Sequence, residues 1–78
     1  MTNIEKYQTV MIESFNIDNK QLSNLTYQGI PEWDSVGHMN LIAAIEETFD
    51  VMLETDDIVE FSSYIKGIEI LKKYEIEF

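Results

Sequence analysis

The chain of 78 residues contains no cysteine, no arginine and a single proline, Pro31. Without cysteine it can form neither a disulfide framework nor a thiolate metal site. Five lysines stand against 15 Asp and Glu residues, so the formal net charge is −10. Binding to nucleic acid or to an anionic membrane surface depends on Lys and Arg, and this composition excludes both as leading functions. We expect partners that carry basic patches instead.

Long apolar runs are also missing. No stretch approaches the roughly 20 residues of a membrane-spanning helix, and residues 1–6 have neither the basic region nor the apolar stretch of a signal peptide. We therefore expect a cytoplasmic protein without membrane insertion. With 45% hydrophobic residues the chain is too apolar for a disordered tail, and its length suits one domain, residues 1–78, with a small core. The high net charge favours a monomer.

The spacing of apolar residues predicts a helix over residues 3–15. One face of this amphipathic helix carries Ile4, Tyr7, Val10, Met11, Ser14 and Phe15. Thr2 and Glu5 match the capping box that begins such a helix. Residues 16–34 are polar and too numerous for a structureless loop, so we expect a short helical turn or a functional edge within them. Its apolar contacts with the core are expected from Ile17, Leu22, Leu25 and Ile30.

Three further helices are predicted in the second half of the chain. The second helix covers about Ser35–Phe49, with Asp34 as its N-cap. Its apolar stripe is Met39, Ile42, Ile45 and Phe49, and its solvent side is marked by Glu46, Glu47 and Asp50. A short third helix, about Asp56–Phe61, is begun by Thr55 or Asp56. The last helix, about Ser63–Tyr74, is expected to turn Tyr64, Ile65, Ile68 and Leu71 inward. No strand is predicted. The expected fold is therefore all-α, a four-helix bundle with a long first loop and a short third helix.

Asp34 and Ser35 are the one place where a reactive side chain meets a suitable local geometry. As the first residue of a helix, Ser35 lies beside unpaired backbone N–H groups and the positive end of the helix dipole. This arrangement favours a phosphate attached to the serine oxygen. The alternative is that both residues only cap the helix, which is the commoner role of an isolated Asp-Ser pair.

The residues around this pair carry a family resemblance. Segment 33–42, WDSVGHMNLI, followed by segment 45–51, IEETFDV, resembles the acyl carrier protein family. That family opens the second helix of a four-helix bundle with Asp-Ser-Leu or a near variant and ends it with an acidic-acidic-x-Phe run. The helix order, the long first loop and the chain length also fit, so the resemblance covers nearly the whole chain.

The resemblance implies a covalent cofactor rather than catalysis. Ser35 would be esterified with 4′-phosphopantetheine by a phosphopantetheinyl transferase that uses coenzyme A. The terminal thiol of the arm would hold an acyl or aminoacyl group as a thioester for loading and acyl-transfer enzymes. The resemblance implies neither catalytic residues nor a metal site. Matching positions for docking on basic patches of the partner enzymes are Asp34, Val36, Glu46, Glu47 and Asp56.

Composition supports such an acidic docking face. Between Gln21 and Ile65 the chain has nine carboxylates and no Lys or Arg. The densest group is Glu46, Glu47, Asp50, Glu54, Asp56, Asp57 and Glu60. A surface of one charge sign raises the rate of association with basic partners. The alternative is a solvated face that serves solubility alone.

Some positions depart from the family pattern. Val36 replaces the usual Leu or Met. Gly37 and Asn40 stand where carriers of bulk fatty-acid synthesis have acidic residues, which weakens the acidic face near Ser35. Together with the run Trp-Asp-Ser-Val-Gly-His, this resembles freestanding carriers of specialised pathways, such as modified-sugar, surface-polysaccharide or secondary-metabolite assembly.

Other residues near the motif have simpler interpretations. His38 lacks the strained elbow and the second histidine of a hydrolase, so a docking or surface histidine is expected. Trp33 is expected to pack against the first turn of the second helix. Met39, Ala43, Leu53, Ile58 and Phe61 are candidates for lining an acyl pocket, although ordinary core packing explains them equally. The acidic group 50–57 lacks the spacing of an EF-hand, and at most weak divalent binding is expected.

A rival function from another class is an acidic helical inhibitor or immunity-type protein that blocks a basic partner. Small size, helical structure and negative charge suit it as well. The inhibitor has no need of Asp-Ser at a helix start, whereas the carrier depends on it.

Overall fold

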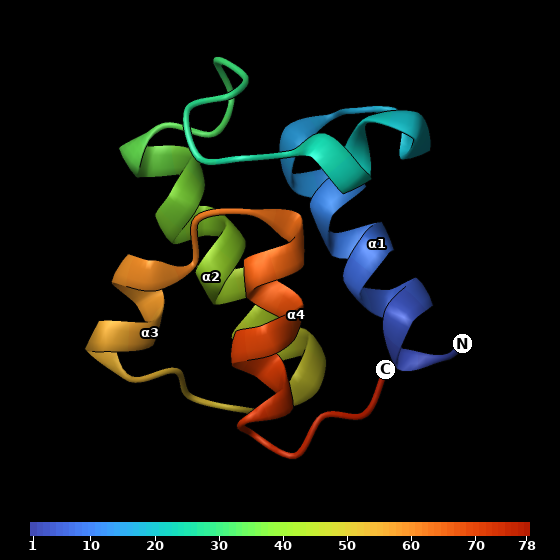
Figure 1. Ribbon diagram of the computed structural model, residues 1–78, viewed down its shortest axis with the longest axis vertical. Coiled ribbons are helices and arrows are strands. Elements are labelled where there is room, and N and C mark those ends of the chain that lie inside the picture. Colours follow the sequence, from blue (N-terminus) through green and yellow to red (C-terminus); the bar gives the residue numbers. More distant parts are fainter.

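All ordered elements of the computed structural model, which describes every residue from Met1 to Phe78, are helices. In chain order they are α1 (Asn3–Phe15), the 3-10 helix η1 (Asn19–Asn24), α2 (Ser35–Phe49), α3 (Thr55–Glu60) and α4 (Tyr64–Lys72). The chain forms no strand, and its one isolated β-bridge joins Thr26 to Ser63. The predicted all-α class is confirmed. In Figure 1, α4 crosses the middle of the molecule, with α3 to one side and α1 to the other.

The two long helices begin and end where local sequence signals predict. Thr2 and Glu5 form the expected capping box, in which Thr2 Oγ1 accepts from the Glu5 N–H and the Glu5 carboxylate accepts from the Thr2 N–H. Both α1 and α2 end at a residue with left-handed backbone, Asn16 and Asp50, each with φ of 53°. Asn and Asp tolerate this conformation better than other non-glycine residues, which explains why the helices stop there.

The connection between α1 and α2 contains the helical turn that its length predicts. Asp18 caps η1, and Leu22 and Leu25 are buried in the core. The chain then pairs with the segment between α3 and α4, because the Tyr27 N–H donates to the Ser62 carbonyl (2.8 Å). In Figure 1 this connection passes over the top of the molecule, coloured teal to green. It therefore brings residues of the loop beside the start of α2.

Aromatic rings from distant segments fill the core. The Trp33 ring stacks on Phe15 with centroids 5.0 Å apart, which fixes the entry to α2 against the end of α1. At the other end, Tyr7 stacks on Tyr64 and donates from its hydroxyl to the Tyr64 carbonyl (2.8 Å). The chain ends lie close together, as Figure 1 shows. The buried hydrophobic residues are Tyr7, Met11, Phe15, Leu22, Leu25, Trp33, Leu41, Ile42, Ile45, Leu53, Phe61, Tyr64, Ile70, Leu71 and Ile76.

Three residues expected on inward faces are exposed. Met39 and Ile65 are each 54% exposed, and Ser14 is also on the surface. On α4 the buried face is formed by Tyr64, Gly67, Ile70 and Leu71, whereas Ile65 follows Tyr64 by one position and is rotated by about 100° from it. Met39 lies on the side of α2 that faces a pocket rather than the core.

The third and fourth helices differ from prediction at their ends. α3 begins at Thr55, one of the two residues predicted to begin it, and ends at Glu60, one residue before the predicted end at Phe61. Its N-cap is Glu54, which makes no side-chain capping bond. α4 begins after Ser63, whose hydroxyl accepts from the Lys66 N–H, and it ends at Lys72. None of the helices combines the length and apolar character needed to cross a membrane.

Candidate functional site

Ser35 is the first residue of α2, and its hydroxyl is not used to cap the helix. The cap is Asp34, as predicted: its Oδ1 accepts from the Gly37 N–H at 2.8 Å. The Ser35 side chain is exposed, and its Oγ lies 3.3 Å from the hydroxyl of Tyr27. Because Asp34 takes the capping role, the Ser35 oxygen remains accessible for chemistry at the helix start.

The first turn of α2 leaves two backbone donors unpaired. Among the first N–H groups of α2, that of Gly37 is bound by Asp34 and that of His38 by the Asp34 carbonyl. The N–H groups of Ser35 and Val36 have no partner within the protein. Free N–H groups and the helix dipole together favour an anion at this end of α2. A phosphate on Ser35 therefore suits the backbone around it.

A pocket of about 360 Å³ opens beside Ser35, between α2, α3 and the loop before α2. Most of its lining is apolar; the residues are Tyr27, Ser35, His38, Met39, Ile58, Val59, Phe61 and Ser62. Of the candidates for lining a pocket, Met39, Ile58 and Phe61 are present. Ala43 is exposed and Leu53 is buried in the core, and both lie outside this pocket. The predicted set therefore divides into pocket, surface and core residues.

Three pocket residues, Tyr27, Val59 and Ser62, were not identified from the sequence. Tyr27 reaches Ser35 because the Thr26–Ser63 bridge holds the loop against the connection after α3. No periodic pattern relates residue 27 to a helix that begins eight residues later. The aromatic side chain of Tyr27 is the one available signal, and it does not indicate which part of the protein the ring contacts.

His38 connects the first turn of α2 to Trp33 and to α3 through hydrogen bonds, which corrects its interpretation as a docking or surface residue. The ring is half-buried, and both nitrogens are in hydrogen-bonding contact. Nδ1 accepts from the indole N–H of Trp33 (2.9 Å), and Nε2 lies 2.7 Å from the Ile58 carbonyl oxygen. The expected packing of Trp33 on the first turn of α2 is confirmed, since its buried ring also stacks on His38.

Gly37 is required by a close backbone approach. A Cβ added at this position would collide with the carbonyl of Glu32, in the turn before α2. Backbone cannot move aside as the end of a flexible side chain can, so a larger residue would displace the turn. Glycine at position 37 is therefore required by the local backbone packing of this chain.

The five expected docking residues do not form one cluster. Asp34 and Val36 flank Ser35, and Val36 is 70% exposed. Glu47 follows Ser35 by about 18 Å along the helix axis, at a rise of 1.5 Å per residue; it is exposed, as is Asp56 on α3. Glu46 is half-buried, and its carboxylate accepts from the Leu53 N–H at 2.9 Å. Four of the five side chains are therefore exposed to a partner, while Glu46 also holds the chain after α2.

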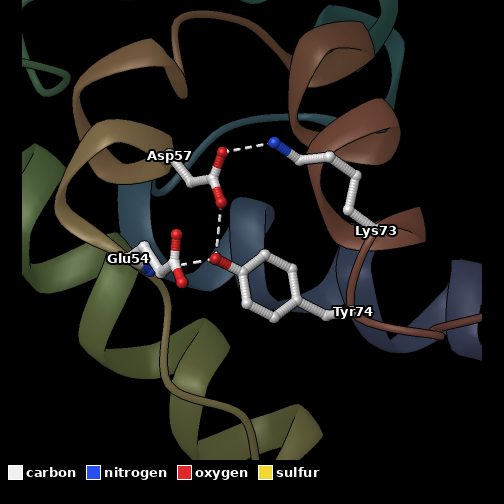
Figure 2. Close-up of polar contacts among 4 residues, drawn as sticks. All are labelled: Glu54, Asp57, Lys73 and Tyr74. Atoms are coloured by element: carbon white, nitrogen blue, oxygen red, sulfur yellow. Dashed lines mark hydrogen bonds and ion pairs between the residues drawn. The ribbon is translucent and has the colours of Figure 1, made fainter.

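Asp57 does not belong to the acidic surface to which the sequence assigned it. It is 7% exposed and binds two side chains of the α4 end, Lys73 (2.6 Å) and Tyr74, as Figure 2 shows. The hydrogen bond from Lys73, followed by that from Tyr74, lowers the pKa of Asp57 below its ordinary value of 3.8. No three His, Asp or Glu side chains are grouped so as to hold a metal ion.

Comparison of the chain with protein-family models, with curated proteins and with solved structures finds no match. The function of the site is therefore inferred from the chemistry of Ser35 and its surroundings.

Proposed function

We propose that this protein is a carrier with the helix arrangement of the acyl carrier proteins, and that Ser35 is its attachment point. Ser35 Oγ forms a phosphoester with the 4′-phosphopantetheine of coenzyme A, the pyrophosphate bond of coenzyme A breaks, and adenosine 3′,5′-bisphosphate leaves. A phosphopantetheinyl transferase carries out this step. The thiol of the bound arm holds acyl or aminoacyl groups as thioesters. The protein itself is then the substrate-bearing partner of enzymes.

The observation that supports this proposal best is the combination at Ser35 of an exposed hydroxyl and an independent cap. A serine that capped α2 would be held by its own helix, whereas here Asp34 performs that role. The unpaired N–H groups of Ser35 and Val36 suit the negative charge of a phosphoester. Modification at this place adds an anion where the helix dipole favours one.

The pocket beside Ser35 gives the arm a surface on which to lie. Met39, Val59 and Phe61 contribute apolar area to it, and Val59 is also 75% exposed at the surface. An arm attached at Ser35 begins at the pocket itself, so its apolar portion can contact these residues without any rearrangement of the helices.

The surface charge suits enzymes with basic patches. Glu47, Asp56 and Glu60 are exposed on α2 and α3 and form no ion pair in the structure. Attraction between such a face and a basic partner accelerates encounter and weakens with salt. Asp56 and Glu60 belong to α3, which also lines the pocket beside Ser35, whereas Glu47 lies near the opposite end of α2.

The test is the intact mass of the protein after incubation with coenzyme A, magnesium and a broad-specificity phosphopantetheinyl transferase. Three samples are compared: the wild type, Ser35→Ala and Ser62→Ala. Ser62 is a matched control because it is exposed and lines the same pocket. We expect one added phosphopantetheine in the wild type and in Ser62→Ala, and none in Ser35→Ala.

An added mass in Ser35→Ala would contradict the assignment of Ser35. If the folded wild type gained nothing from several transferases, the inhibitor function would become the better explanation. An inhibitor retains its binding to a basic partner when Ser35 is replaced by Ala, whereas a carrier loses its function.

A further inference from the structure

Two sets of hydrogen bonds attach α3 to the rest of the protein. It is a helix of 6 residues without a side-chain cap, so its own capping contributes little to its position. At its first turn, Asp57 binds Lys73 and Tyr74. On the side of the pocket, the carbonyl of Ile58 meets the ring of His38.

The two hydrogen bonds of His38 define one protonation state. The indole N–H of Trp33 can only donate, so Nδ1 of His38 must carry no proton. The Ile58 carbonyl can only accept, so Nε2 must carry one. A neutral ring with its proton on Nε2 satisfies both partners. A second proton, on Nδ1, would place two N–H groups against each other.

We infer that neutral His38 is a positioning residue that fixes α3 against the Ser35 end of α2 and thereby sets the width of the pocket beside Ser35. The ring lies three residues after Ser35 and lines that pocket together with Ile58. The inference concerns the unmodified protein, and it depends on the proposed function only for its consequence for an arm on Ser35.

The groups around the ring leave it without an ionic partner. The Tyr27 ring, from the loop, is T-shaped to it with centroids 5.4 Å apart, and Trp33 and Phe61 are the other neighbouring rings. α3 faces the imidazole with a backbone carbonyl, and on α2 the Asp34 carboxylate is bound to the Gly37 N–H. The one ion pair of the structure is elsewhere, between Lys73 and Asp57, so no carboxylate is paired with a charged His38.

Two substitutions of His38 each keep one of its two hydrogen bonds and remove the other. In His38→Gln the side-chain amide nitrogen reaches the place of Nε2 and can still donate to Ile58. In His38→Asn the amide oxygen takes the place of Nδ1 and can still accept from Trp33. Asn40→Gln is the control, because Asn40 is exposed on the same helix and forms no side-chain hydrogen bond. Hydrogen exchange of the backbone amides in α3, relative to those in α1, measures how firmly α3 is held.

We expect exchange in α3 to be about tenfold faster in His38→Asn, the factor that one hydrogen bond contributes, and within about twofold of the wild type in His38→Gln. Global stability should be lower in His38→Gln than in His38→Asn, because His38→Gln leaves the buried indole N–H of Trp33 without an acceptor. A merely space-filling histidine predicts the same order in both measurements, and that outcome would overturn the inference.

Neither hydrogen exchange nor the unfolding measurement requires coenzyme A. Failure of Ser35 to be modified would therefore refute the proposed function and leave the assignment of His38 to be judged by these two measurements.

Discussion

The side chains of Asp57 and Lys73 form the one ion pair of the structure, with Lys73 Nζ 2.6 Å from Asp57 Oδ1. Tyr74 completes the contact: its hydroxyl donates to the other carboxylate oxygen and accepts from the Glu54 N–H at 2.9 Å (Figure 2). Asp57 is buried while Lys73 is 59% exposed at its side chain, so these bonds replace the hydration that the carboxylate has lost. They join the start of α3 to the end of α4.

Removing the Tyr74 hydroxyl should loosen this junction. Tyr74→Phe loses one hydrogen bond to a charged group and one from the backbone, and we expect a loss of about 1–2 kcal/mol in the free energy of unfolding. Urea unfolding measures the loss. Tyr27→Phe is the control, because the Tyr27 hydroxyl contacts only the exposed Ser35 hydroxyl and its removal should change stability by less than about 0.5 kcal/mol. Equal losses in the two variants would contradict the role of Tyr74.

The contribution of Asp57 should depend on pH in a defined direction. Since its pKa is lower in the folded protein than its ordinary value of 3.8, the folded state holds its proton less tightly than the unfolded state. The stabilisation is therefore complete above about pH 5 and is lost as the pH falls through 3.8 toward the folded pKa. We expect Asp57→Asn to be less stable than the wild type at pH 6, with the difference shrinking at pH 3. Glu60→Gln, on the exposed side of α3, is the control and should be nearly as stable as the wild type at pH 6.

The stability of the protein at alkaline pH depends in part on Lys73 and Tyr74, the partners of Asp57. Their hydrogen bonds to that carboxylate raise the pKa values of Lys73 and Tyr74 above 10.5 and 10.0. Burial also raises the pKa of Tyr7. These contributions are present below pH 10 and decline as the pH rises beyond it. The wild type should therefore lose stability above about pH 10, and Tyr74→Phe should lose less over the same range.

Gly67 gives a prediction opposite to that of helix propensity. In an exposed helix, replacing Gly by Ala stabilises by about 1 kcal/mol. Here Gly67 is buried, and an added Cβ would collide with the Tyr7 hydroxyl and the Phe61 ring. We expect Gly67→Ala to destabilise by about 1–3 kcal/mol in thermal or urea unfolding. Lys72→Ala, exposed on the same helix, is the control and should be nearly neutral.

How far the sequence predicts this protein depends on the range of the interactions. Helix ends are encoded locally, so Thr2 with Glu5 and Asp34 with Gly37 could be predicted from residues three positions apart. The environment of Asp57 could not be predicted from nearby residues, because its partners lie 16 and 17 residues further along the chain. A carboxylate in an acidic run resembles its exposed neighbours until α4 brings a cation to it.

The candidate site divides in the same way. Ser35 was found because the dipeptide and the helix start are contiguous. The pocket beside it was found in part, since Met39, Ile58 and Phe61 have helical spacing, whereas Tyr27 arrives through a bridge between two loops. The role of His38 was missed because it depends on a backbone carbonyl 20 residues away.

The neighbours Asp34 and Ser35 should separate stability from modification. Asp34→Ala removes the cap of α2, and we expect a loss of about 1 kcal/mol in the free energy of unfolding. Ser35→Ala keeps the cap and should change stability by less than about 0.5 kcal/mol. Both variants are measured by chemical denaturation monitored by helical circular dichroism. Loss of cooperative folding in Ser35→Ala would show that the serine is structural.

Glu46 and Glu47 offer the same separation on the acidic face. The Glu46 carboxylate accepts from the Leu53 N–H and so holds the chain that leaves α2, whereas Glu47 is exposed and has no side-chain hydrogen bond. We expect Glu46→Ala to lower the free energy of unfolding by about 1 kcal/mol and Glu47→Ala to leave it nearly unchanged. In the transferase reaction, Glu47→Ala should slow modification of Ser35 at low salt, and the difference from the wild type should disappear as salt screens the attraction. A rate defect of Glu47→Ala that persisted at high salt would indicate a direct contact in place of electrostatic steering.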